Sequence, residues 1–229
     1  MSKTLLVIGA GPGIGRSVAA LFAKNRYPNV ALIARREAQL EIEKKAVEDA
    51  VGPEGKVRTY VVDVVDAAAL TKALEAADAE LGKPECVFYN AARVLPSELL
   101  THDVAEIEHD FKINVSALYA VSQRYIPHLT SLASSDADAA PALLVTSSRL
   151  PQEPIPQVFA LSLVKAAQRN LVQSLRMTYE SQGVHVGLIV VGGAVAEDHA
   201  TLNPGNIAER TWAWFEGIKE SPSLEVCID

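Results

Sequence analysis

The chain has 229 residues, of which 49% are hydrophobic, so it has the length of one domain with a sizeable core. Its formal net charge is −7, which argues against a nucleic-acid partner. No apolar run approaches the ~20 residues of a membrane-spanning helix, and neither the two cysteines nor the five histidines have metal-ligand spacing. We therefore expect residues 1–229 to form one cytoplasmic domain that binds no metal, nucleic acid or membrane.

A glycine-rich turn near the N-terminus follows the apolar run Thr4–Ile8 and precedes a helical pattern that includes Val18 and Phe22. Glycine allows positive φ and lets a phosphate approach the backbone closely. The start of the following helix offers free N–H groups and a partial positive charge, which favour pyrophosphate. This context predicts a dinucleotide-binding turn. Its residues are Gly9, Ala10, Gly11, Pro12, Gly13, Ile14 and Gly15.

Strand and helix patterns alternate along the whole chain, which predicts a parallel sheet covered on both faces. The expected strands are 4–8, 29–34, 56–62, 85–89, 142–146, 184–191 and 224–228. The expected helices after the first are 37–51, 66–81, 103–129, 157–182 and 207–218, with a surface loop at 130–140. We predict a doubly wound α/β fold of Rossmann type with strand order 3-2-1-4-5-6-7 and the cofactor beyond the carboxyl ends of the strands.

Arg35 and Arg36 directly follow the second strand, at the position that faces the adenosine ribose in such folds. A carboxylate there favours the 2′-hydroxyl of NAD, whereas arginine suits the 2′-phosphate of NADP. We therefore expect NADP(H) to be preferred over NAD(H), with Arg35 as the main determinant. The alternative is that the two arginines only end the strand on a solvated surface.

Two further strand ends carry candidate cofactor residues. Asp63 and Val64 follow the third strand, where a side-chain acceptor can take the adenine amino group. Asn90, Ala91 and Ala92 follow the fourth strand, and their small size lets the backbone pass close to the cofactor.

As a set, these motifs resemble the short-chain dehydrogenase/reductase family over essentially the whole chain. The turn from Gly9 to Gly15 looks like the family's cofactor turn. The resemblance implies that Asn114 holds a proton-relay water and that Ser148 polarises a substrate carbonyl. It implies further that Lys165 holds the nicotinamide ribose and lowers the pKa of a catalytic tyrosine. These three residues are the expected catalytic residues.

The chain departs from the family at two places. The family signature is Tyr-x-x-x-Lys, but counting back four residues from Lys165 gives Leu161, which has no hydroxyl. After the sixth strand, Gly193 and Val195 fall in the expected cofactor-binding segment, yet Glu197 replaces the threonine that would bind the carboxamide. The chain thus resembles a divergent branch that lacks the catalytic tyrosine.

Reduction of a carbonyl needs a proton donor, and such acid catalysis contributes ~10²–10⁴-fold. Without the tyrosine, three outcomes stay open: a reaction that needs no acid, such as reduction of an iminium; donation by Ser148, Glu153 or Lys165; or no chemistry. We expect an oxidoreductase that reduces a small organic C=O, C=N or C=C substrate. The alternative is a non-catalytic NADP(H)-binding protein that acts as a sensor or partner scaffold, and a non-redox enzyme comes last.

Two further expectations concern packing and assembly. By analogy with the family, the helices 103–129 and 157–182 are expected to form a homodimer or homotetramer. Trp212 and Phe215 share one helical face, which favours core packing over contact with substrate.

Overall fold

The computed structural model describes residues 3–229, in which seven parallel strands form one sheet. The strand order is β3-β2-β1-β4-β5-β6-β7, which confirms the order predicted from the sequence. The strands are β1 (Thr4–Ile8), β2 (Asn29–Ala34), β3 (Lys56–Val61), β4 (Cys86–Tyr89), β5 (Ala142–Ser148), β6 (His185–Val191) and β7 (Glu225–Ile228). The central strands are apolar runs because helices cover both of their faces.

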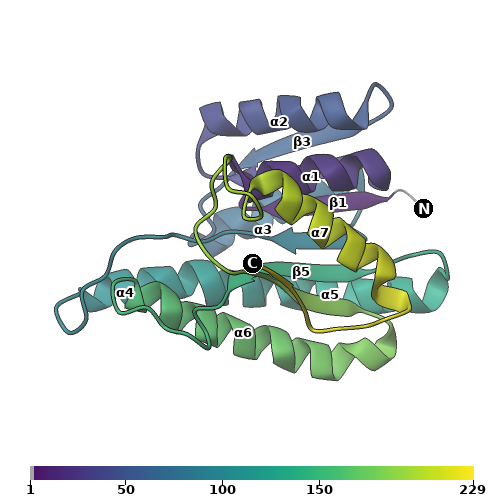
Figure 1. The fold of residues 1–229 in the computed structure, drawn as a ribbon. Coiled ribbons are helices and arrows are strands. Elements are labelled where there is room, and N and C mark those ends of the chain that lie inside the picture. The colour runs from purple at the N-terminus through teal and green to yellow at the C-terminus, as the bar shows by residue number, and fades with distance from the viewer. Residues whose placement is uncertain (1–2) are drawn as a thin grey trace.

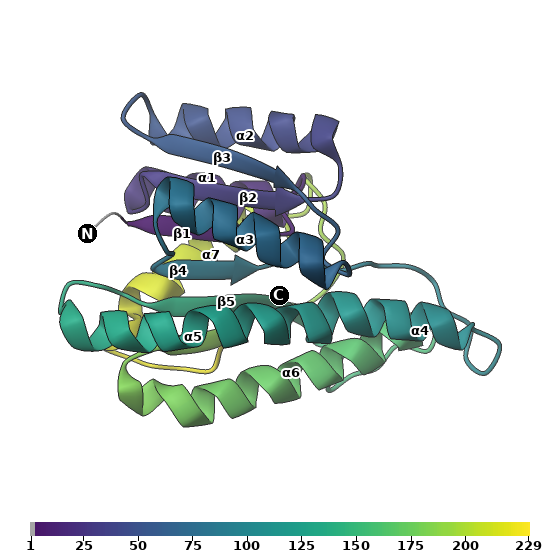
Figure 2. The same cartoon turned by 180° about the vertical axis from the view of Figure 1, so that it is seen from behind.

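Helices pack on the two faces of the sheet in separate layers (Figure 1). One layer consists of α1 (Ile14–Asn25), α2 (Glu37–Val51) and α7 (Pro204–Glu216). The other consists of α3 (Ala67–Leu81), α4 (Val104–Phe111), α5 (Ala117–Ser135) and α6 (Phe159–Tyr179), and is seen from the front in Figure 2. Each layer buries its own hydrophobic core against the sheet.

Aromatic side chains of α1 and α7 join the two helices over the first face of the sheet. The ring of Phe22 lies 4.9 Å from that of Trp212 and 5.3 Å from that of Phe215. Trp214 packs edge-on against His185 of β6, with 4.8 Å between ring centroids. The expectation that Trp212 and Phe215 are packing residues is therefore confirmed.

The long helix predicted at 103–129 differs from the observed structure in two ways. It is divided by a π-helical turn at Lys112–Ser116, and α5 continues to Ser135. The loop predicted at 130–140 is therefore wrong in its first half. Its serines lie in the last turns of the helix, where the Ser134 and Ser135 hydroxyls donate to the Ser131 carbonyl.

Most other elements begin or end within two or three residues of the predicted bounds, and two of these differences have a bearing on the site or a clear cause. β5 extends to Ser148, so the candidate serine is the last residue of a strand and does not lie beyond it. The helix predicted at 207–218 begins at Pro204, because the Asn203 side chain accepts a hydrogen bond from the Asn206 N–H at 2.8 Å and caps it. Within residues 3–229, no helix combines the length and apolarity that a membrane crossing requires.

Candidate active site

The glycine turn lies between the end of β1 and the start of α1, close against the end of β4. Gly9 has φ +92°, and a Cβ there would lie 2.5 Å from the Ala91 nitrogen, so only glycine fits. Gly13, with φ +87°, is the N-cap of α1. At Gly11 a Cβ would meet nothing within 4 Å, so this part of the turn faces open space.

Asn90 ties together the ends of three neighbouring strands. Its Nδ2 donates to the Gly9 carbonyl at 3.0 Å, and its Oδ1 accepts from the Thr146 hydroxyl at 2.8 Å. Because both polar atoms of the amide are engaged, the turn after β1 is fixed relative to β4 and β5. Asn90 therefore positions the backbone around the turn as well as lining the cavities beside it.

A cavity of about 210 Å³ opens at the carboxyl ends of β1 to β4. It brings together eight of the residues that the sequence predicted to bind the cofactor: Gly9, Arg35, Arg36, Asp63, Val64, Asn90, Ala91 and Ala92. The Arg35 guanidinium lies 3.8 Å from the Asp63 carboxylate, and both side chains remain substantially exposed. The cavity thus presents cationic groups at its outer edge.

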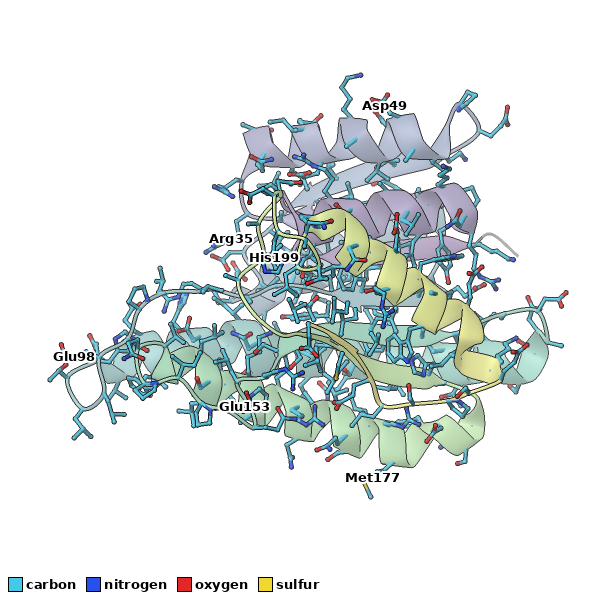
Figure 3. The ribbon with its side chains drawn as sticks, in the orientation of Figure 1. Arg35, Asp49, Glu98, Glu153, Met177 and His199 are labelled. Carbon is cyan, nitrogen blue, oxygen red and sulfur yellow. The ribbon has the colours of Figure 1, made fainter. Side chains whose placement is uncertain are left out.

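A second cavity of about 850 Å³ adjoins the first, because Asn90 and Ala92 line both. It lies beyond the ends of β4, β5 and β6. Its walls are mainly apolar, and they include Ile14 and Leu161. The expected residues that line it are Ser148, Lys165, Gly193 and Val195. Figure 3 shows Arg35 and Glu153, which line different cavities, at the same end of the sheet.

Lys165 is the one ionisable group buried in the wall of this larger cavity among the residues described, with 6% of its surface exposed. Its Nζ donates to the Thr146 carbonyl at 2.9 Å and to Gln168 Oε1 at 2.8 Å. Burial lowers the pKa of Lys165 to about 7, because the charged amine loses hydration there. Nearby, the Ser148 Oγ accepts from the Leu150 N–H at 3.3 Å.

Asn114 is fully buried in the π-helical turn and does not line either cavity. Its Nδ2 donates to the Asp110 carbonyl at 3.0 Å, while its Oδ1 has no partner among the residues described. Its own carbonyl accepts from Gln168 Nε2 at 2.9 Å. The structure therefore connects Asn114 to Lys165 through the side chain of Gln168.

Charged side chains lie at the mouth of the larger cavity. The Arg149 Nε donates to Asp229 Oδ1 at 2.9 Å, and a second guanidinium nitrogen donates to the other carboxylate oxygen. Glu153 lies 4.0 Å from the same guanidinium. Arg149 is therefore paired with two carboxylates, of which Glu153 also lines the cavity.

Gln168 and Thr146, which hold the lysine, are not among the residues predicted from the sequence. Gln168 has a recognisable signal, since it shares the buried stripe of α6 with Leu161, Val164 and Lys165. A fully buried glutamine on such a stripe needs hydrogen-bond partners. Thr146 has no such signal, because it is its backbone carbonyl that accepts from the lysine.

The cavities fit a dinucleotide in their arrangement. The open face at Gly11 leaves room for phosphates at the start of α1, and Pro12, Gly13, Ile14 and Gly15 complete that turn. One cavity with exposed arginines and another with a buried lysine continue from it on either side.

Comparisons with known proteins agree with this geometry. A family model described as short chain dehydrogenase matches residues 3–205. Oxidoreductase UcpA of Salmonella typhimurium is 31% identical over 193 residues, which cover 83% of this chain and 68% of UcpA. The 17-beta-hydroxysteroid dehydrogenase 13 of Rattus norvegicus is 30% identical over 131 residues, or 56% of this chain. The match covers 41% of the rat protein, so the chain spans less than half of that relative's length.

Among solved structures, an NADPH-bound short chain oxidoreductase of Pseudomonas aeruginosa PAO1, described as containing an atypical catalytic center, has a similar fold. Its TM-score is 0.82 at 21% identity, and the match covers 98% of this chain and 95% of that chain.

Proposed function

The chain belongs to the short chain dehydrogenase family, and from this premise we propose that it is an NADP(H)-dependent oxidoreductase with an atypical active site. The substrate is a small organic molecule with a C=O, C=N or C=C bond. The observation that carries the proposal is the pair of adjoining cavities, one edged by Arg35 and the other containing Lys165. The NADPH-bound Pseudomonas structure supports the choice of cofactor by its similar fold.

The residues of the smaller cavity bind and orient the adenosine half. Arg35 supplies a positive charge for the 2′-phosphate, and Asp63 offers an acceptor for the adenine amino group. The glycine turn and the start of α1 hold the pyrophosphate through backbone N–H groups. When bound, the nicotinamide supplies hydride.

The residues of the larger cavity act on the substrate. The Ser148 hydroxyl donates a hydrogen bond to the oxygen or nitrogen of a C=O or C=N bond, or to the carbonyl oxygen conjugated with a C=C bond, and Lys165 holds a proton at Nζ. The apolar walls exclude water and strengthen both interactions. Leu161 contributes only an apolar surface one helical turn before Lys165, so the proton comes from another group or is not required.

Calorimetric titration of the purified chain with NADPH and with NADH tests the cofactor half of this proposal. Micromolar binding of NADPH with much weaker binding of NADH is the expected result. Screening imines, enones and ketones for NADPH oxidation then tests the chemical half. Failure of both nucleotides to bind contradicts the proposal as a whole.

A non-catalytic NADP(H)-binding role is the second candidate, and the apolar side chain at position 161 favours it. It predicts the same calorimetric result but no NADPH oxidation with any of the three substrate classes. Turnover of any one class excludes it.

A further inference from the structure

Gln168 is a fully buried glutamine whose two polar atoms are both in use. Its Oε1 accepts from Lys165 Nζ at 2.8 Å, and its Nε2 donates to the Asn114 carbonyl at 2.9 Å. The side chain therefore spans the space between the lysine and the π-helical turn. The Gln168 amide thus joins Asn114 directly to Lys165.

An amide differs from a water molecule in what it can pass on. Water accepts one proton while giving up another, whereas the Gln168 amide presents a fixed acceptor to Lys165 and a fixed donor to Asn114. A proton that leaves Lys165 toward Gln168 has no onward path. The hydrogen bonds from Lys165 through Gln168 to Asn114 are therefore unbroken, but they cannot carry a proton.

The amine nitrogen of Lys165 has three substituent positions besides its carbon. Two are directed at the Thr146 carbonyl and at Gln168 Oε1. The third has no acceptor among the residues described, and Lys165 is itself part of the wall of the 850 Å³ cavity. Any hydrogen bond or proton that Nζ gives to a bound molecule passes through this position.

The charged side chains nearest to Lys165 are paired with other residues and do not contact its Nζ. Arg149 and Glu153 line the same cavity from the segment between β5 and α6, where Arg149 is paired with Asp229. Asp110, one turn before Asn114 in chain order, is paired with Arg93 at 2.6 Å. No carboxylate faces Nζ among its hydrogen-bond partners, so neutral acceptors alone hold the amine in place.

We infer that Gln168 is a positioning residue that closes the rear of the active site and leaves Lys165 able to exchange protons only with the substrate cavity. The inference rests on the proposed function for what occupies that cavity. In this view the proton that the family's tyrosine would give to the substrate comes from Lys165 Nζ.

The test measures the protonation of Lys165 in the cofactor-free chain, so it does not depend on turnover. Acetic anhydride labels neutral amines, and mass spectrometry gives the labelling of Lys165 from about pH 6 to about pH 11. Gln168→Met removes both hydrogen bonds but keeps the space filled, whereas Gln168→Ala also opens room for water. Gln168→Glu keeps the shape and places a carboxylate beside the amine.

The three variants are expected to differ in direction. Water behind the amine in Gln168→Ala restores hydration, and the carboxylate in Gln168→Glu pairs with it, so both move the labelling profile up by about one pH unit or more. Gln168→Met removes an acceptor of the ammonium group without restoring hydration, so it moves the profile below that of the wild type. If the alanine variant does not fold, the downward shift of the methionine variant still tests whether Gln168 holds the amine.

If Gln168 does not hold the amine, the profiles of Gln168→Ala and Gln168→Met are unchanged, and that result overturns the inference; Gln168→Glu only shows that a charge at this position reaches Nζ. Gln173→Ala and Gln173→Met are matched controls on the same helix, since Gln173 is only partly buried. Calorimetric titration of the wild-type chain with NADPH tests the proposed function separately from the role of Gln168. If NADPH does not bind but the labelling shifts are observed, only the proposed function is contradicted.

Discussion

The Arg35 guanidinium lies 3.8 Å from the Asp63 carboxylate across the ends of the neighbouring strands β2 and β3. Both side chains are more than one third exposed, so the pair is weakly held and contributes little to stability. A loosely paired arginine at the edge of the smaller cavity is free to turn toward a phosphate. The contact therefore places a candidate 2′-phosphate ligand beside a candidate adenine ligand.

We expect Arg35→Asp to weaken NADPH binding by about tenfold or more, because a charge-assisted contact is replaced by repulsion. NADH, which lacks the 2′-phosphate, is expected to lose much less. Calorimetric titration of both nucleotides measures the ratio. Arg58→Asp is the control, since Arg58 is a similarly exposed arginine on β3 that pairs with Glu80. An unchanged NADPH-to-NADH ratio in Arg35→Asp contradicts the proposed role.

The sheet and the residues of the smaller cavity were predictable because they follow from local patterns. Alternating apolar runs and amphipathic helices define a doubly wound fold, and residues such as Arg35 and Asp63 occupy fixed places at strand ends in it. The predicted order places β2 beside β3, and the observed register, which pairs Ala34 with Val61, brings together the side chains that follow the two strands.

The interior of the larger cavity was less predictable because it depends on contacts between distant elements. The bond from Gln168 to the Asn114 carbonyl requires the π-helical turn to pack against α6, 54 residues away in sequence. Arg149 meets Asp229 across 80 residues. Neither contact follows from spacing, since both depend on how helix and strand ends pack in three dimensions.

Two glycine substitutions distinguish a glycine that the fold requires, Gly9, from one that faces open space, Gly11. Gly9→Ala is expected to destabilise the fold by about 2 kcal/mol or more, because it adds a Cβ 2.5 Å from the Ala91 nitrogen at a positive φ. Gly11→Ala is expected to change stability by no more than about 0.5 kcal/mol, because its Cβ meets nothing within 4 Å. Urea denaturation measures both, and equal losses would refute the distinction.

Leu161→Tyr tests whether the larger cavity keeps the geometry for carbonyl reduction. The phenol would lie one helical turn before Lys165 in the cavity wall and would supply a proton donor. We expect ketone reduction to rise by at least about tenfold, below the full ~10²–10⁴-fold contribution of an optimised acid. The rate of NADPH oxidation is the measurement. Leu161→Phe is the control, and equal rates for the two variants would show that the hydroxyl has no effect.

Self-association is the expectation for the faces of α5 and α6, which carry exposed apolar side chains. Tyr119 is 51% and Leu163 is 54% exposed. We expect sedimentation at micromolar concentration to give a homodimer or homotetramer, and Leu163→Glu to shift it toward the monomer because a charge is costly in an apolar interface. Ile42→Glu on α2, where Ile42 is 55% exposed, is the control. A monomeric wild-type chain contradicts this prediction.

The buried amine of Lys165 makes stability depend on pH in a definite direction. Burial lowers its pKa from an ordinary 10.5 to about 7, so between these values the unfolded chain binds more protons than the folded one. The contribution of Lys165 to the free energy of unfolding therefore increases as pH rises through this window. Below about pH 7 both states carry the proton, and the full cost of burying the charge applies.

Comparison with Lys165→Met isolates this contribution, since methionine has a similar length and no charge. The substitution leaves the Thr146 carbonyl and Gln168 Oε1 without their donor, but that loss is the same at every pH. We expect the melting temperature of the wild type, relative to the variant, to rise from about pH 7 to about pH 10. Lys72→Met, at an exposed lysine of α3, controls for the loss of one positive charge. A difference that stays flat or falls over this range would mean that Lys165 remains charged in the folded protein, and Nζ would then face the cavity as a permanent ammonium group.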